Sequence, residues 1–379
     1  MTVHRLQEFG ETIFATMTAL AVENEAVNLG QGFPDSDGPQ RMLDIAQENI
    51  ANGNNQYAPL RGVPELVSAI AETYSVPQDH VVVTAGATEA ITATVLGLVE
   101  PGQEVIVLEP YYDAYIAAVA LADATRIPVP LKASGNSWDI DVAAVRAAIT
   151  DKTAMVIINT PHNPTGSVFS REALTELAEL CVEKDLIVLD DEVYENLTFG
   201  NAEHVSIASL PGMASRTVTV SSAAKSFNCT GWKTGWAIAE PKLLDGVIKA
   251  KQFTTFVSTT PFQPAVAHAL RYEQEWLDGM VSELAECRSI LVEGLKQLGF
   301  HVHNTGGTYY VVADISSTGM TGMDFCMQLP VTKGVAAIPL AAFTGNPEPW
   351  QHKVRFAFCK RPEVIREAVR RLTNDTPSA

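Results

Sequence analysis

The chain has 379 residues, and its 46% hydrophobic and 18% charged residues are typical of a folded soluble protein rather than a disordered one. Its formal net charge of −18 would repel a phosphate backbone, which argues against nucleic acid as a partner. The five cysteines are scattered without a C-x-x-C motif or metal-like spacing, so we expect reduced thiols and no metal site.

The length and the apolar runs set the expected class of protein. At about 100–200 residues per domain, the chain is long enough for two domains, one large and one small. Glycine, proline or charge interrupts each apolar run before it reaches membrane-spanning length, so no membrane is expected as a partner. Residues 1–10 carry charges and lack the apolar core of a signal peptide, which predicts a cytoplasmic protein.

The first part of the chain predicts alternating helices and strands. Residues 1–29 indicate an amphipathic helix followed by a short strand over 26–29. The turn Gly30-Gln31-Gly32-Phe33-Pro34-Asp35 then either points backbone N–H groups at a ligand or is a plain loop. The next predicted elements are helices over 41–52, 65–74 and 113–121 and strands over 81–84, 104–108 and 125–129.

The junction Ala85-Gly86-Ala87-Thr88-Glu89 joins the strand over 81–84 to a helix that runs to about Leu98. Small residues that open a helix leave its first N–H groups free, and the positive end of the helix dipole then suits a phosphate. Many α/β turns look similar, so this junction alone is only a moderate indication of a phosphate site.

The middle of the chain continues the alternation with apolar strands and helices. Predicted strands cover 154–158, 186–189, 216–220 and 235–239, and predicted helices cover 142–149, 171–183 and 242–253. This pattern predicts an α/β fold with a mainly parallel sheet that helices cover on both faces. Beyond a helical stretch over 263–296, the predicted strands over 308–313 and 354–359 and helices over 324–329 and 362–372 indicate an α+β region.

Polar side chains follow three of the predicted strands. Asn159-Thr160-Pro161-His162-Asn163-Pro164-Thr165-Gly166 follows one strand, Asp190-Asp191-Glu192-Val193-Tyr194 another, and the segment around Lys225 a third. Because parallel sheets bind ligands at the carboxyl ends of their strands, we expect an amide, a carboxylate, a phenol and an amine on one rim.

Lys225 is the candidate nucleophile. Ser221-Ser222-Ala223-Ala224 precede it, and these small residues leave space for a planar ring bound to its amine. An apolar neighbourhood and a second cation, Lys233, would disfavour the ammonium form, and the neutral amine attacks carbonyl groups. We therefore interpret Lys225 as the residue that holds pyridoxal phosphate as a Schiff base, the alternative being a solvated loop lysine. Arg355 has apolar neighbours and needs an anion, either a bound carboxylate or an internal salt bridge.

The motifs together resemble the class I/II pyridoxal phosphate-dependent aminotransferases of fold type I, nearly end to end and in the same order. The segments that carry the resemblance are Asn159 to Gly166, Asp191 to Tyr194, Ser222 to Lys225 and Gly231-Trp232-Lys233-x-Gly235-Trp236. Gly30 to Asp35 and Val354-Arg355-Phe356 are similar to the kynurenine and glutamine aminotransferase branch. Residues 83–91, 221–233 and 334–339 resemble bacterial N-succinyldiaminopimelate aminotransferases of lysine biosynthesis.

The resemblance implies an α/β architecture of two domains. The large domain, residues 36–265, would hold a mainly parallel, seven-stranded-type sheet flanked by helices and would bind pyridoxal phosphate. Residues 1–35 and 266–379 would form the smaller α+β domain.

The resemblance also implies a role for each site residue. Lys225 would form the Schiff base and, once displaced by the substrate amine, would move a proton between the substrate Cα and the cofactor. Asp191 would keep the pyridine nitrogen protonated, so that the ring withdraws electrons. Arg355 would clamp the substrate carboxylate, assisted by Asn163 and the Gly32 backbone. The other cofactor contacts would be Tyr194 and Asn163 at O3′, Tyr112 on the ring, and Gly86, Ala87, Thr88, Ser222, Lys233 and the neighbouring subunit's Tyr57 at the phosphate.

The resemblance implies amino-group transfer between an amino acid and a 2-oxo acid by a homodimer with shared sites. The implied substrate is N-succinyl-L,L-diaminopimelate, with glutamate and 2-oxoglutarate as the other pair. Two departures from many relatives, Ala224 in place of serine and Lys233 in place of arginine, leave this chemistry intact. Alternatives are a broad kynurenine, glutamine or methionine aminotransferase, a cysteine-conjugate β-lyase, and a ligand-sensing regulator, against which the acidity of the chain argues.

Overall fold

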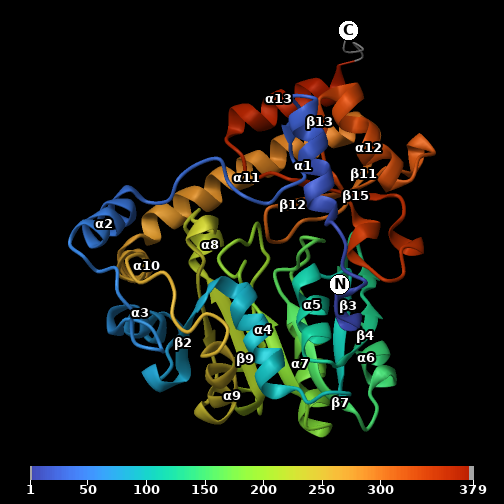
Figure 1. Ribbon diagram of the computed structural model, residues 1–379. Coiled ribbons are helices and arrows are strands. Elements are labelled where there is room, and N and C mark those ends of the chain that lie inside the picture. The colour runs from blue at the N-terminus through green and yellow to red at the C-terminus, as the bar shows by residue number, and fades with distance from the viewer. Residues whose placement is uncertain (1, 375–379) are drawn as a thin grey trace.

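The computed structural model describes residues 2–374, and its largest feature is a seven-stranded sheet (Figure 1). The strand order is β2-β10-β9-β8-β7-β3-β4. β10 runs antiparallel to its neighbours β2 and β9, and the other neighbouring strands are parallel to one another. The predicted α/β fold with a mainly parallel sheet is therefore confirmed.

The strands of this sheet lie within a few residues of the predicted ones. They are β2 (Val81–Ala85), β3 (Glu104–Glu109), β4 (Thr125–Pro130), β7 (Thr153–Asn159), β8 (Ile187–Asp191), β9 (Thr217–Ser222) and β10 (Thr234–Ile238). All six residues of β9 are buried, because a central strand of such a sheet is covered on both faces.

Helices cover both faces of the sheet, and the alternation of side chains along each strand divides the core between them. Val105 and Val107 of β3 pack with helices α4, α5 and α9 on one face. Ile106 and Leu108 pack with α6 and α7 on the other face. The helices around the sheet are α2 (Gln40–Ala51), α3 (Pro64–Tyr74), α4 (Gly86–Leu98), α5 (Asp113–Leu121), α6 (Val142–Ala148), α7 (Arg171–Glu183), α9 (Pro241–Lys251) and α10 (Gln263–Tyr272).

A second, antiparallel sheet lies beyond the carboxyl ends of the parallel strands (Figure 1). Its order is β11 (His301–Val302), β12 (Tyr310–Asp314), β15 (Lys353–Ala357) and β14 (Ile338–Pro339). The helices that share its core are α1 (Ile13–Glu23), α11 (Gln274–Gln297), α12 (Gly322–Lys333) and α13 (Pro362–Thr373). Among the described helices, none combines the length and apolar composition needed to cross a bilayer.

The segment from α1 to β1 packs on this second layer, whereas the residues before it contact the large-sheet layer, where Glu8 forms an ion pair of 3.0 Å with Arg126 of β4. β1 (Val27–Asn28) pairs in parallel with β13 (Val335–Ala336), so a segment near the start of the chain lies beside one more than 300 residues later. The N-terminal helix is shorter than predicted because it begins only at Ile13, where the Thr12 side chain accepts a hydrogen bond from the Ala15 N–H.

Several short elements were not predicted from the sequence. β5 (Lys132–Ser134) and β6 (Ser137–Asp139) form a small hairpin, and α8 (Ala223–Ser226) is a single helical turn directly after β9. Elements this short contain too few residues to produce a recognisable period. α8 carries Lys225, so the position of the candidate nucleophile depends on a turn that periodicity does not reveal.

The helices α4 and α9 cross at two glycines. A Cβ atom added to Gly97 would lie 2.3 Å from the carbonyl oxygen of Gly246, and one added to Gly246 would lie 2.7 Å from that of Gly97. The two backbones are therefore in direct contact. This contact fixes the helix whose first turn lies at the cavity described next.

Candidate active site

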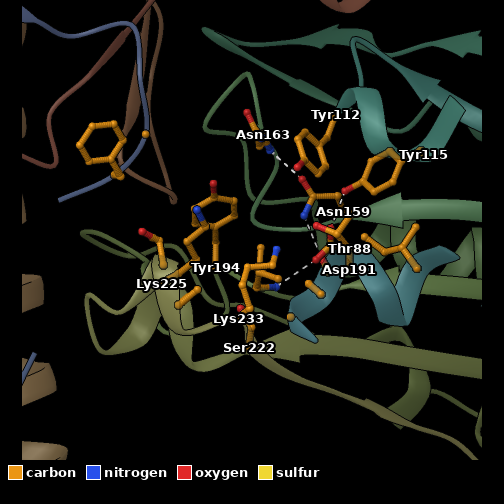
Figure 2. A pocket seen from close by; sticks show the side chains of 18 of the residues that line it. Thr88, Tyr112, Tyr115, Asn159, Asn163, Asp191, Tyr194, Ser222, Lys225 and Lys233 are labelled. Carbon is orange, nitrogen blue, oxygen red and sulfur yellow. Dashed lines mark hydrogen bonds between the residues drawn. The ribbon is translucent and has the colours of Figure 1, made fainter. Parts of the chain in front are cut away.

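A cavity of about 410 Å³ lies at the carboxyl ends of the central parallel strands (Figure 2). The large sheet and its loops supply most of its wall, and Phe14, Gln31, Gly32, Phe33 and Tyr310 close it from the second layer. Of the predicted site residues, the wall contains Gly32, Gly86, Ala87, Thr88, Tyr112, Asn163, Asp191, Tyr194, Ser222, Lys225 and Lys233. The rim expected from the strand ends is therefore present.

Two predicted residues lie outside this wall. Arg355 is 0% exposed and lies behind Asn163, whose Oδ1 accepts a hydrogen bond of 2.8 Å from the Arg355 Nη1. Tyr57 is 82% exposed, and its ring packs edge-on against Phe256 with ring centres 5.5 Å apart. A single chain therefore does not place Tyr57 in its own cavity.

The turn α8 places the amine of Lys225 at the end of β9. Its Nζ lies 5.6 Å from the centre of the Tyr194 ring and 5.5 Å from that of the Tyr309 ring. Burial, reinforced by Arg355 and Lys233, lowers the pKa of Lys225 to about 8, although Cys359 and Asp191 act in the opposite direction. The depressed basicity inferred from the sequence is present, and burial is its largest cause.

Asp191 ends β8 on the cavity side. Its Oδ2 accepts a hydrogen bond of 2.7 Å from the Tyr115 hydroxyl, and its Oδ1 accepts one of 3.3 Å from the Val193 N–H. Burial raises the pKa of Asp191 to about 6, against the opposing effects of Tyr115, Val193 and Lys225. None of the ion pairs among residues 2–374 includes Asp191, so this buried carboxylate would gain from a cationic ligand group.

The start of α4 forms a concave surface for an anion. Gly86 has a φ of +74°, and a Cβ atom added there would lie 3.1 Å from the Lys233 Nζ. Lys233 itself adopts a left-handed backbone with a φ of 54°. The free N–H groups of the first helical turn, the hydroxyl of Ser222 and the Lys233 amine thus surround one space.

These features fit pyridoxal phosphate, the cofactor that the resemblance implies. Lys225 offers an amine for the aldehyde, Asp191 a carboxylate for the pyridine nitrogen, and the α4 turn a site for the phosphate. Tyr112 lines the same cavity, and the side chains surround one hollow (Figure 2).

Arg355 is the most constrained charge near the cavity. Its guanidinium stacks on Tyr310 at 3.9 Å from the ring centre, and its Nη2 donates to the Gly30 carbonyl at 2.9 Å. Its Nε has no hydrogen-bond partner, and no carboxylate forms an ion pair with it within the described part of the chain. The internal salt bridge considered from the sequence is thus not found there, and a bound carboxylate is the remaining alternative.

Three residues of the site were missed in the sequence. Tyr115 and Tyr112 are three positions apart, a spacing that places two residues on one helix face and could have revealed Tyr115. Asn159 donates from Nδ2 to the Asp191 carbonyl at 2.7 Å, and its Oδ1 accepts from the Asn163 N–H at 2.8 Å. The Tyr310 hydroxyl lies 3.3 Å from that of Tyr194, and no local pattern predicts this long-range contact.

The whole chain is similar to known aminotransferases. Residues 24–372 match the family model described as aminotransferase class I and II. The chain is 49% identical to a probable N-succinyldiaminopimelate aminotransferase of Mycobacterium tuberculosis, with 98% of each chain covered. It is 36% identical to the methionine aminotransferase of Escherichia coli, with 97% of each covered, and 32% identical to mouse kynurenine–oxoglutarate transaminase 3, with 95% of this chain and 87% of that protein covered.

Solved structures give the same result. The N-succinyldiaminopimelate aminotransferase from Mycobacterium tuberculosis superposes with a TM-score of 0.96 at 49% identity, over 98% of this chain and 99% of that one. An Escherichia coli protein with a methionine aminotransferase function superposes with a TM-score of 0.94 at 35% identity, over the same shares of the two chains.

The pKa of Lys225 leads to a pH prediction. An amine is neutral above its pKa, so the apoprotein should take up pyridoxal phosphate faster as pH rises, with a half-maximal rate near pH 8. Stopped-flow absorbance of the cofactor measures this rate. Lys225→Ala is the control and should lack the pH-dependent step, and a midpoint near the ordinary lysine value of 10.5 would contradict the prediction.

Proposed function

Because the chain belongs to the class I and II aminotransferase family, we propose that its amino donor is N-succinyl-L,L-diaminopimelate and its acceptor is 2-oxoglutarate. The protein is a transaminase that depends on pyridoxal phosphate. The 49% identity to the Mycobacterium tuberculosis protein over 98% of the chain supports the choice of donor. The one structural observation that supports an amino-acid substrate is the buried, unpaired guanidinium of Arg355.

Each side chain of the cavity has a proposed task. When bound, pyridoxal phosphate supplies an aldehyde that takes up the substrate amine and a protonated ring that withdraws electrons from the substrate Cα. Lys225 accepts and returns the Cα proton through its Nζ. Asp191 holds the proton on the ring nitrogen, and Tyr115 and Val193 orient its carboxylate by the hydrogen bonds they donate.

The remaining contacts hold the cofactor in place. Tyr194 and Asn163 donate hydrogen bonds to the ring oxygen, and Tyr112 covers one face of the ring. The residues proposed to hold the phosphate are Gly86, Ala87, Thr88, Ser222 and Lys233, together with the partner subunit's Tyr57. Support for these contacts comes from the wall of the cavity, which contains all of them except Tyr57.

Arg355 is proposed to bind the α-carboxylate of every substrate. Its Nε is free, and its two other nitrogens are already oriented by Asn163 and Gly30. Gly32 lies at the same place, and a Cβ atom there would come within 1.9 Å of the Tyr310 hydroxyl, so its backbone is accessible only because it is glycine.

A second candidate is a broader aminotransferase for methionine, glutamine or kynurenine. Two aromatic rings, Phe14 and Phe33, and the carboxamide of Gln31 line the part of the cavity that the second layer closes. Such a wall suits an apolar or amide side chain as well as a succinylated one. The similarity to methionine aminotransferase and kynurenine transaminase supports this candidate. A cysteine-conjugate β-lyase would use the same lysine.

We also propose the domain division and the location in the cell. Residues 36–265 would form the large domain and residues 1–35 and 266–379 the small one, which the two sheets and the pairing of β1 with β13 support. Residue 1 and residues 375–379 of these ranges lie outside the described part. A cytoplasmic location is part of the same proposal.

A homodimer is proposed because exposed aromatic side chains gather around Tyr57. Phe256 contacts its ring, and Phe253, three residues earlier, is 83% exposed. Exposed apolar groups of this size are typical of protein interfaces. A second copy of the chain would cover them and would receive Tyr57 in its cavity. Sedimentation velocity tests this proposal, and a monomeric protein would contradict it.

The donor is tested with a panel of amino acids and 2-oxoglutarate. We expect the kcat/KM for N-succinyl-L,L-diaminopimelate to exceed those for methionine, glutamine and kynurenine by about tenfold or more, a difference of about 1.4 kcal/mol in transition-state binding. Coupled detection of glutamate measures each value. Equal values across the panel would instead support the broad aminotransferase.

Arg355→Gln should lower kcat/KM for every amino acid donor by roughly 30- to 1000-fold, because a desolvated charge contact to carboxylate is worth about 2–4 kcal/mol. An alkylamine donor, which lacks the carboxylate, should be converted equally by both proteins. Arg361→Gln, a change at an exposed ion pair with Asp35, is the matched control and should leave kcat/KM unchanged. A comparable loss with the alkylamine would show that Arg355 acts only on the structure.

A further inference from the structure

A second group of ionisable side chains is buried on the side of β8 that faces away from the cavity. Asp190 and Glu192 flank Asp191 and are 0% and 1% exposed. Because side chains alternate along a strand, Asp190 points to the face opposite Asp191. There its Oδ2 accepts a hydrogen bond of 3.3 Å from the Ile207 N–H. The cofactor site therefore has a charged cluster directly behind it.

The two carboxyl groups of this cluster shift each other's pKa in opposite directions. Asp190 Oδ1 and Glu192 Oε1 are both buried and have no hydrogen-bond partner among residues 2–374. Two neighbouring buried carboxyls satisfy these atoms when one is protonated and donates to the other. Burial, and then repulsion by Glu192, raises the pKa of Asp190 well above its usual value, which favours the protonated form of Asp190.

Glu192 is the ionised member, and it faces His204. The His204 Nε2 lies 3.2 Å from the Glu192 Oε2, and the His204 side chain is only 14% exposed. Burial lowers the pKa of His204. The adjacent carboxylate of Glu192, and then that of Glu195, raises this pKa by more, so it lies above the usual value. Burial likewise raises the pKa of Glu192, but His204 and then Asp190 and Ser206 bring it below the usual value. Both pKa shifts favour an imidazolium beside a carboxylate, and the contact is an ion pair without an aligned hydrogen bond, because neither ring nitrogen of His204 has a hydrogen-bond partner among residues 2–374.

Other elements packed against the cluster add one more titratable carboxyl. Glu195 accepts hydrogen bonds of 2.5 Å from the Tyr74 hydroxyl on α3 and of 2.7 Å from the Ser221 hydroxyl on β9. Burial, and then repulsion by Glu192, raises the pKa of Glu195 to about 7. In the described chain, the ion pairs of this cluster include a single cation, His204.

We infer that His204 is a positioning residue, which neutralises Glu192 and so keeps Asp191 ionised for the cofactor ring nitrogen. The inference rests on the proposed role of Asp191. The negative charge of Glu192, on the opposite face of the strand, raises the pKa of Asp191. Burial raises the same pKa and is the larger effect. A protonated Asp191 has no charge with which to hold a proton on the ring nitrogen. An imidazolium at position 204 removes most of this repulsion, because it lies in direct contact with its source.

A metal ion is the competing explanation of the same cluster. Glu192, Glu195 and His204 place three potential ligand atoms within 4.8 Å of one another, and zinc accepts such donors. However, one oxygen of Glu195 already accepts from two hydroxyl groups, and the 3.2 Å between His204 and Glu192 is the distance of a direct ion pair. The geometry favours the ion pair, and metal analysis distinguishes the two.

The test compares charge variants of the holoenzyme. His204→Gln leaves the Glu192 charge uncompensated and, at a pH below the Asp191 pKa of about 6, should weaken pyridoxal phosphate binding by up to about tenfold, the equivalent of one unit in the pKa of Asp191. The bound cofactor's absorbance should change at a pH about one unit higher, because Asp191 then gains its proton at higher pH. Glu192→Gln/His204→Gln removes both charges and should restore affinity to within about twofold of the original protein.

Equal affinity of His204→Gln and the original protein would overturn the inference. So would a double variant that binds no better than His204→Gln, since a purely structural role is not rescued by removing a second charge. If His204→Gln does not fold, Glu192→Gln alone decides, because with both charges neutral it should bind the cofactor normally. Stoichiometric metal in the holoenzyme, whose removal by a chelator reproduces the His204→Gln behaviour, would also overturn it.

The cofactor measurements need no substrate, so they are independent of the donor panel. Asp191→Asn provides the link to the proposed function. If Asp191→Asn binds pyridoxal phosphate normally, the proposed role of Asp191 fails and the inference fails with it. If Asp191→Asn binds weakly while His204→Gln binds normally, the inference alone fails.

Discussion

The structure depends on three buried charges that lack an ionic partner in the described chain. Lys225 and Asp191 line one cavity, Arg355 lies behind its wall at Asn163, and among the described residues none of the three takes part in an ion pair. Lys225 and Asp191 reduce the energetic penalty of burial by shifting their proton equilibria toward the neutral forms. A guanidinium cannot do this, so Arg355 relies on the carbonyl of Gly30, the amide of Asn163 and the ring of Tyr310. A ligand with an anion for Arg355 and a cation for Asp191 completes the charge balance.

The parallel sheet explains how residues so far apart in the chain meet. β7, β8 and β9 end side by side, which brings Asn159, Asp191 and Ser222 to one edge. The same alternation of side chains puts Asp191 on the cavity side and Asp190 on the other. The carboxylate of Asp191 in the cavity and the cluster behind it are thus consequences of two successive positions on one strand.

Sequence patterns predicted the features that repeat along the chain and missed those that depend on contacts across it. The apolar strands and the polar residues at their ends were evident, because period and composition are local properties. Tyr310 and His204 reach their partners only after the chain has folded, and no spacing in the sequence indicates those contacts. The short strand over 26–29 was predicted and corresponds to β1, but its two-residue partner β13 was missed, because pairing rather than propensity makes β13 a strand. The cavity of a single chain leaves out Tyr57, whose proposed position requires a second copy.

The pairing of β1 with β13 has a mechanical consequence. It attaches Phe14, Gln31 and Gly32 to the layer that carries Arg355, whereas Lys225 and Asp191 belong to the large sheet. A rigid shift of one layer against the other would therefore widen or narrow the entrance without disturbing the groups that face the ring. A substrate that contacts both Arg355 and Lys225 would connect the two layers and restrict their relative movement, and its dissociation would remove that restriction.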